Sequence, residues 1–291
     1  MTDLARPRRS VLYMPGSNPR ALEKARSLPA DTLILDLEDA VAPDEKARAR
    51  DLVGAACAAG FGAREVVIRI NGLDTDWGAA DLAAAVAAGP DAILLPKVDG
   101  AADLLRAEAG LGDAPQTTRL WAMMETAQGI LAAAQIAAAT PRLACLVMGT
   151  NDLLKELRAE TSADRLALMP ALGTCLLAAR AHGRAAIDGV YNAFKDEAGL
   201  RAECAQGRIM GFDGKTLIHP AQLAIANEVF APGAAALAEA RAQLAAWEEA
   251  AAEGRGVAVL NGRIVENLHV ENARRLIAED AAIQALQAPD A

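Results

Sequence analysis

The sequence is poor in the side chains that build most zinc and redox sites. It has only three histidines, and none lies at metal-ligand spacing from another. Its four cysteines are widely separated in apolar or helical surroundings, at Cys57, Cys145, Cys175 and Cys204. This spacing argues against a cysteine metal cluster and predicts reduced thiols. Aromatic residues make up only 3% of the chain, so close helix packing must come from its many alanines.

The chain also lacks an excess of positive charge and a long apolar run. Its 29 basic and 38 acidic side chains give a formal charge of -9, which argues against a nucleic-acid partner. An anionic ligand must therefore be held by local cations. No segment approaches the about 20 apolar residues that span a bilayer. Residues 1–10 lead into a short strand instead of a signal-peptide core, so we expect a cytoplasmic protein with no membrane partner.

Short apolar runs of strand length recur along the first three quarters of the chain. Patterns typical of helices lie between them, at 19–27, 44–59, 77–88 and 166–181. About eight such units in roughly 220 residues predict a (β/α)8 barrel, an α/β TIM barrel, with a doubly wound open sheet as the alternative. The eight expected strands are residues 11–14, 32–37, 66–70, 92–95, 120–124, 143–148, 186–190 and 209–212.

Polar residues close nearly every one of these strands, which favours the barrel over the open sheet. In a barrel the carboxyl ends of all strands meet around one mouth, where catalytic residues gather. The residues that we expect there are Asp36, Glu38, Arg69, Lys97, Glu125, Asp152, Asp188 and Lys215.

The last part of the chain has a different pattern. After a helical stretch, Gly254 and Gly256 interrupt the periodicity, and residues 257–265 have the pattern of a β-hairpin around Asn261-Gly262, a pair favoured in type I′ turns. A helix is expected at about 271–287. We therefore expect a catalytic barrel domain at 1–253 and a C-terminal lid or arm, a hairpin followed by a helix, at 254–291.

Glu125 and Asp152 follow two successive strands and are candidate metal ligands. Carboxylate oxygens on rigid elements suit a Mg²⁺ that takes its other ligands from water and substrate. The alternative is that the two acids cap the next helix or pair with a lysine. Gly149 has no Cβ, so it would let backbone amides approach a bound carboxylate or oxyanion.

Three acids crowd the end of the second strand, Asp36, Glu38 and Asp39, and such crowding favours a cation nearby. Arg69 ends the third strand and could bind a carboxylate bidentately or polarise a thioester carbonyl. A structural ion pair between Arg69 and Glu38 is the alternative, and both could hold.

Arg20 and Lys24 lie four residues apart on one face of the first expected helix. Together with Lys97 and Lys215 they could hold the phosphates of a nucleotide-like group. Each of them alone is more often a solvated surface charge.

Taken together, these motifs resemble those of the citrate lyase β-subunit-like family of the HpcH/HpaI aldolase superfamily, especially malyl-CoA lyases and (3S)-malyl-CoA thioesterases. The resemblance covers nearly the whole chain and rests on residues 9–17, 36–41, 67–72, 95–97, 124–126 and 149–153. It implies a trimer-forming (β/α)8 barrel, a trimer or dimer of trimers, whose C-terminal segment closes a neighbouring subunit's site.

The resemblance also implies roles for particular residues. Glu125 and Asp152 would hold Mg²⁺, or Mn²⁺ in its place, and Arg69 would contact the acyl-CoA or 2-oxo acid with Glu38 supporting it. Gly149 and Asn151 lie in the matching motif and would bind substrate. In the lyases of this family an aspartate of the C-terminal segment acts as base, and Glu266 stands at that position here.

Three functions follow as hypotheses. The first is Mg²⁺-dependent cleavage, or formation, of a short 3-hydroxy dicarboxylic acyl-CoA such as malyl-CoA, giving acetyl-CoA or propionyl-CoA and a 2-oxo acid such as glyoxylate. Glu266 would be the base and Arg69 the group that stabilises the enolate. The alternative is thioester hydrolysis of the same class of CoA ester. A third hypothesis, from another class, is a non-catalytic barrel that binds a CoA ester.

Overall fold

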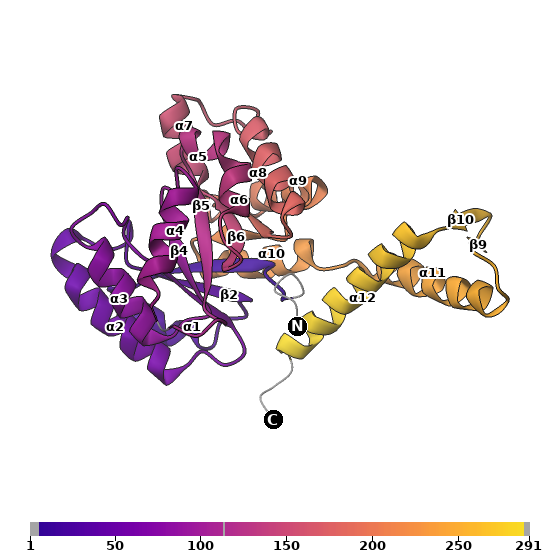
Figure 1. Ribbon diagram of the computed structural model, residues 1–291, viewed down its shortest axis with the longest axis horizontal. Helices are drawn as coiled ribbons and strands as arrows, with labels where there is room; N and C mark the ends of the chain where they lie inside the picture. Colours follow the sequence, from indigo (N-terminus) through magenta and orange to yellow (C-terminus); the bar gives the residue numbers. More distant parts are fainter. Residues whose placement is uncertain (1–5, 113, 288–291) are drawn as a thin grey trace. The chain divides into compact units, whose positions relative to one another are not determined.

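The computed structural model describes residues 6–112 and 114–287. Eight parallel strands form a closed barrel, in which each strand pairs with its neighbours in the sequence and the first pairs with the last. Figure 1 shows the strands with helices around them. The predicted barrel is confirmed. Its strands are β1 (Ser10–Pro15), β2 (Thr32–Asp36), β3 (Glu65–Arg69), β4 (Ala92–Leu95), β5 (Arg119–Met124), β6 (Leu143–Met148), β7 (Ala185–Asp188) and β8 (Gly214–Leu217).

Helices follow the strands along the chain, and their apolar side chains join one large hydrophobic cluster with the outward-facing strand residues, such as Leu12 and Leu33. Two short 3₁₀ turns, Pro43–Glu45 and Pro220–Gln222, precede helices. The helices of this part are α1 (Pro19–Ala25), α2 (Lys46–Ala59), α3 (Gly78–Ala88), α4 (Ala101–Gly110), α5 (Ala127–Leu131), α6 (Ala133–Ala138), α7 (Thr150–Leu157), α8 (Met169–Ala181), α9 (Glu197–Met210) and α10 (Leu223–Phe230).

The alternation of side chains along the strands decides which polar groups face the inside of the barrel. A second buried cluster fills the interior and includes Val11, Ile34, Val67, Met123 and Val147. Because side chains alternate with a period of two, the residues two positions further along face the same way. Those residues are Tyr13, Asp36, Arg69, Glu125 and Gly149, so the barrel geometry directs five mouth residues inward.

The eighth strand lies later in the chain than its apolar pattern suggested. Residues 209–212 were expected to form it, but Ile209 and Met210 end α9, and Gly211 caps this helix with a left-handed backbone at φ 109°. The actual strand starts at Gly214, where a Cβ would overlap the backbone carbonyl of Arg8. The sequence of β8 is largely polar, so it does not have the apolar pattern of a buried strand. The short apolar run at the end of α9 has that pattern and therefore predicts a strand there.

Asp188 and Lys215, expected at the barrel mouth, instead face outward between the sheet and α9. Asp188 has the opposite parity to the interior residue Ile187 and accepts hydrogen bonds from Arg165 Nη1 at 2.7 Å. Lys215 Nζ lies 2.6 Å from a Glu203 carboxylate oxygen, and its side chain has no exposed surface. This buried ion network removes both residues from the candidate site, so the phosphate role considered for Lys215 is wrong.

The chain divides into two compact units, and the second begins at Ala231 because α11 packs with the hairpin and the last helix. This unit contains α11 (Ala234–Ala252), β9 (Ala258–Leu260), β10 (Arg263–Val265) and α12 (Asn267–Gln287). The hairpin is confirmed, and its turn residues Asn261 and Gly262 have φ values of 51° and 74°, as a type I′ turn requires. A functional division into a barrel domain to 253 and a lid from 254 stays a prediction.

Two further expectations concern membrane-spanning segments and the cysteine thiols. Within residues 6–112 and 114–287, no helix combines the length and the apolar character that a membrane crossing requires. The thiols of Cys57, Cys175 and Cys204 are free, and Cys145, Cys175 and Cys204 are buried.

Candidate active site at the carboxyl end of the barrel

The centre of the site is a buried ion pair between β2 and β3. The strand register places Asp36 beside Arg69, and both side chains face inward. Arg69 donates from Nε to Asp36 Oδ1 at 2.7 Å and from Nη2 to Oδ2 at 2.6 Å, a bidentate pair. Its guanidinium carbon lies 4.9 Å from the centre of the Tyr13 ring. Arg69 is therefore clamped in one orientation, and the pair with Asp36 uses two of its five N–H groups.

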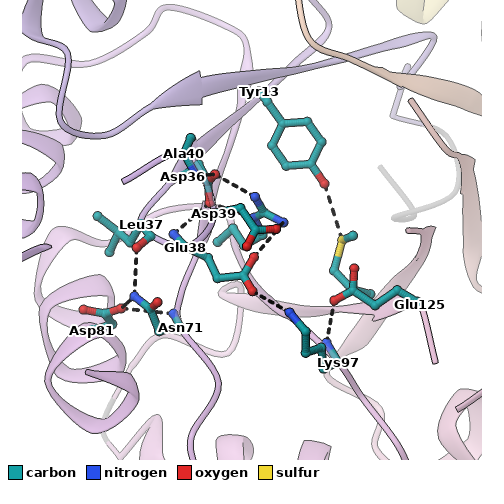
Figure 2. Close-up of polar contacts among 12 residues, drawn as sticks. Tyr13, Asp36, Leu37, Glu38, Asp39, Ala40, Asn71, Asp81, Lys97 and Glu125 are labelled. Carbon is teal, nitrogen blue, oxygen red and sulfur yellow. Dashed lines mark hydrogen bonds and ion pairs between the residues drawn. The ribbon is translucent and has the colours of Figure 1, made fainter. Parts of the chain in front are cut away.

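Glu38 connects this pair to Lys97, which follows the next strand, β4 (Figure 2). Its Oε2 lies 2.8 Å from Arg69 Nη1, and its Oε1 accepts a hydrogen bond of 2.9 Å from Lys97 Nζ. Burial raises the pKa of the Glu38 carboxyl, while the charge of Arg69 acts in the opposite direction. The ion pair considered for Arg69 and Glu38 is thus present. The role of Glu38 in supporting Arg69 during the reaction stays a prediction.

Glu125 follows β5 and lies almost completely buried, with 2% of its surface exposed. Its Oε1 accepts a hydrogen bond of 2.8 Å from the backbone N–H of Lys97. Within the described part of the chain, Oε2 accepts no hydrogen bond. Burial raises the pKa of the Glu125 carboxyl to about 7, and the Lys97 N–H acts against that rise. A carboxylate buried in this way is stabilised in its charged form by a cation at the free oxygen.

Glu125 and Asp152 carry the oxygen ligands that a hard divalent cation prefers. Glu125 and Gly149 follow the paired residues Met124 and Met148 of β5 and β6, and Asp152 lies in the first turn of α7, half-buried. No group of three or more His, Cys, Asp and Glu side chains suited to a metal occurs among the described residues. Two carboxylates leave most of the coordination sphere for water and substrate, as Mg²⁺ prefers.

Gly149 is required by the position of Glu125. A Cβ at residue 149 would overlap both the Cβ and Oε2 of Glu125, although the backbone φ of -97° would accept an alanine. We therefore expect Gly149→Ala to displace the Glu125 carboxylate, lower the free energy of unfolding by about 1–3 kcal/mol and weaken Mg²⁺ binding. Thermal unfolding with and without Mg²⁺ measures both effects.

Gly173 provides the matched control for that substitution. It lies within α8, and a Cβ there would have no heavy atom within 4 Å. Gly173→Ala should raise the free energy of unfolding by about 0.5–1 kcal/mol, because alanine is the better helix residue. A Gly149→Ala variant that behaved like Gly173→Ala would contradict the close packing of Glu125.

The structure adds Asn192 to the residues expected at the mouth. Asn151 begins the turn that carries Asp152, and its side-chain amide exchanges two hydrogen bonds with Asn192, at 2.8 and 3.3 Å. The loop after β7 is thereby joined to the first turn of α7, the helix that follows β6. Sequence reasoning missed Asn192 because it lies four residues beyond its strand, in a run with no recognisable motif.

Arg20 and Lys24 lie on α1 and are exposed, as an anion-binding role requires. Together with Arg26 and Ser27 they line a shallow surface hollow of about 690 Å³. Lys97, by contrast, pairs with Glu38. The phosphate-binding role of Arg20 and Lys24 stays a prediction.

Glu266 belongs to the second unit, at the turn between β10 and α12. Its side chain is exposed, and its backbone N–H donates to His269 Nδ1 at 3.1 Å. The role of Glu266 as a base stays a prediction.

A closed eight-stranded barrel with acids and an arginine at the carboxyl ends of its strands has the arrangement of a TIM-barrel enzyme. The sequence model of the HpcH/HpaI aldolase/citrate lyase family matches residues 9–220. The chain belongs to this family, so the resemblance predicted from its motifs is confirmed.

Similarity to individual proteins extends over nearly the full chain. A (3S)-malyl-CoA thioesterase of Cereibacter sphaeroides (strain KD131) is 60% identical over 289 residues, 99% of this chain and 100% of that protein. Citrate lyase subunit beta of Escherichia coli (strain K12) is 39% identical over 280 residues, covering 94% and 93% of the two chains. The solved structure of CitE from Mycobacterium tuberculosis, in complex with magnesium, acetoacetate and coenzyme A, has a TM-score of 0.76 and 30% identity over 96% of this chain and 99% of that one.

Proposed function

We propose that this chain hydrolyses the thioester of a short 3-hydroxy dicarboxylic acyl-CoA, with (3S)-malyl-CoA as the leading substrate. The observation that carries this proposal is the 60% identity to a (3S)-malyl-CoA thioesterase over 99% of the chain. The sequence motifs alone led to carbon–carbon cleavage as the first hypothesis and thioester hydrolysis as the alternative. The identity to this thioesterase favours hydrolysis. Family membership also argues against the third hypothesis, a non-catalytic barrel.

The proposal includes a Mg²⁺ ion, with Mn²⁺ as a substitute, held by Glu125 and Asp152. The free Oε2 of Glu125 and the magnesium in the M. tuberculosis CitE complex support this assignment. When bound, the cation supplies Lewis acidity at a substrate oxygen and orients the substrate.

The chain's own residues complete the reaction. Arg69, clamped by Asp36 and Glu38, offers its remaining N–H groups to the carboxylate or the thioester oxygen. Glu266 is the proposed base that takes a proton from water. The water oxygen then bonds to the thioester carbon, the C–S bond breaks, and the sulfur of CoA takes up a proton.

Substrate recognition is assigned to residues around the mouth. Gly149 and Asn151 lie beside the proposed cation site, where they would contact the acyl group. Arg20 and Lys24 would hold the phosphates of CoA. An assembly of identical chains, a trimer or a dimer of trimers, and a cytoplasmic location remain parts of this proposal.

The test separates hydrolysis from carbon–carbon cleavage by their products. Purified protein is incubated with (3S)-malyl-CoA and Mg²⁺, and free CoA, malate, acetyl-CoA and trapped glyoxylate are measured. We expect CoA and malate in equal amounts, no glyoxylate, and no turnover after chelation of the metal by EDTA. Equal amounts of acetyl-CoA and glyoxylate would instead assign the lyase reaction.

A further inference from the structure

Lys97 has an unusual backbone conformation for its place in the barrel. It follows β4 with φ 48°, in the left-handed region that residues with a side chain rarely adopt. Three other non-glycine residues share this conformation among the described residues: Arg158, Arg165 and Asn261. Arg158 caps α7 and Asn261 forms the hairpin turn, which are ordinary places for it. Lys97 lies two residues after the end of β4, at the mouth, where such an outlier points to a function.

The conformation brings the backbone of Lys97 to the candidate metal ligand. The Lys97 N–H donates to Glu125 Oε1 at 2.8 Å, and the next residue, Val98, donates to the carbonyl of Met123 at 3.3 Å. These bonds occupy one oxygen of the Glu125 carboxylate and leave the other free. A group that donates a hydrogen bond to a metal ligand fixes the orientation of that ligand.

The side chain of Lys97 reaches in the other direction (Figure 2). Its Nζ lies 2.9 Å from Glu38 Oε1, and the other oxygen of Glu38 lies 2.8 Å from Arg69 Nη1. About half of the Lys97 side chain is exposed, so it also borders the open mouth. One residue therefore contacts both the carboxylate proposed to bind the cation and the acid that fixes the arginine.

We propose that Lys97 is a positioning residue with two separable roles. Its left-handed backbone aims an N–H at Glu125 and fixes that carboxylate for the cation. Its ammonium group holds Glu38, and through Glu38 it holds Arg69 against the substrate. The inference rests on the proposed function, because it takes Glu125 as a ligand of Mg²⁺.

The backbone role is tested with Lys97→Gly, Lys97→Ala and Lys97→Val. All three remove the ammonium group, so they differ in how well residue 97 tolerates a positive φ. Glycine adopts it freely, alanine bears the same restriction as lysine, and a β-branched valine is a true outlier there. Mg²⁺ affinity is measured without substrate, from the shift of the unfolding temperature in a Mg²⁺ titration. We expect wild-type affinity in the Gly and Ala variants and about 10- to 100-fold weaker binding in the Val variant.

The ammonium role is tested with Lys97→Ala against Lys97→Arg. Steady-state hydrolysis of (3S)-malyl-CoA at saturating Mg²⁺ should show kcat reduced about tenfold or more in the Ala variant, since a misplaced catalytic group costs that much. The Arg variant keeps a cation beside Glu38 and should recover most of the loss. Equal kcat in the wild type and the Ala variant would overturn this role.

The outcomes separate this inference from the proposed function. A wild-type protein that is not stabilised by Mg²⁺ would overturn the metal assignment itself. A stabilised wild type with equal Mg²⁺ affinity in the Ala and Val variants would overturn only the backbone role of Lys97. Circular dichroism confirms that each variant is folded, and Lys97→Thr, also β-branched, replaces Lys97→Val if that variant does not fold.

Discussion

Replacing Glu125 by glutamine is expected to abolish Mg²⁺-dependent turnover while leaving the fold intact. Glutamine has the same shape and keeps an oxygen that can accept the Lys97 N–H, but it has no charge to hold a cation. Loss of a metal's Lewis acidity removes several kcal/mol of transition-state stabilisation. At 1.36 kcal/mol for each tenfold change in rate, kcat/KM should fall by about a thousandfold or more.

The metal-free stability of the same variant distinguishes a binding defect from a folding defect. Wild-type Glu125 is buried, and burial raises the pKa of its carboxyl, because the charged form is unfavourable there without a cation. The neutral glutamine avoids that cost, so the unfolding temperature without Mg²⁺ should equal or exceed that of the wild type. Addition of Mg²⁺ should stabilise the wild type and leave Glu125→Gln unchanged. A Mg²⁺ response in the variant equal to that of the wild type would contradict Glu125 as a ligand.

Replacing Arg69 by lysine should have the second largest effect. The guanidinium bonds Asp36 through two atoms and Glu38 through a third, and an ammonium group cannot reproduce that geometry. Asp36 is 1% exposed, so part of its hydrogen bonding would be lost in a buried place. We expect kcat/KM to fall by about 100- to 1000-fold, as when an oxyanion donor is removed.

Stability should fall in parallel, because breaking a buried ion pair costs about 3–5 kcal/mol when one partner is removed. Arg69→Ala should approach that loss in urea denaturation, and Arg69→Lys should lose less. Arg48→Lys is the matched control, since Arg48 pairs with Glu45 on the exposed surface and its loss should cost less than about 1 kcal/mol. Wild-type activity in Arg69→Lys would show that the guanidinium does not contact substrate.

The fold was predictable because most strands are plainly apolar and separated by helical patterns. Seven expected strands correspond to β1 through β7, whose buried residues are mostly Val, Ile, Leu, Ala and Met. β8 was misplaced because its sequence, Gly-Lys-Thr-Leu, is largely polar. Its lysine is tolerated inside the protein only because Asp188 and Glu203, distant in the sequence, neutralise it. Long-range pairing of this kind is not visible in a local pattern.

The position of a site residue was predictable where that residue directly follows an apolar strand. Contacts between site residues were not predictable where they depend on strand register or on an unusual backbone conformation. Glu125 and Gly149 were found because each directly follows an apolar run. The sequence suggested Glu38 as a partner of Arg69, and that ion pair is present. The closer, bidentate pairing of Arg69 with Asp36 depends on the register of β2 and β3, which the sequence does not show. The positive φ of Lys97 has no signal in a lysine, so its contact with Glu125 appeared only in the folded chain.

The most direct test of the account is where a divalent cation binds. Crystals grown with Mn²⁺, whose anomalous scattering locates it without ambiguity, should show one ion per chain bonded to Glu125 and Asp152, with water in its other positions. Crystals of Glu125→Gln should lack that ion. An ion bound elsewhere, with Glu125 and Asp152 bonded only to protein groups, would contradict the account.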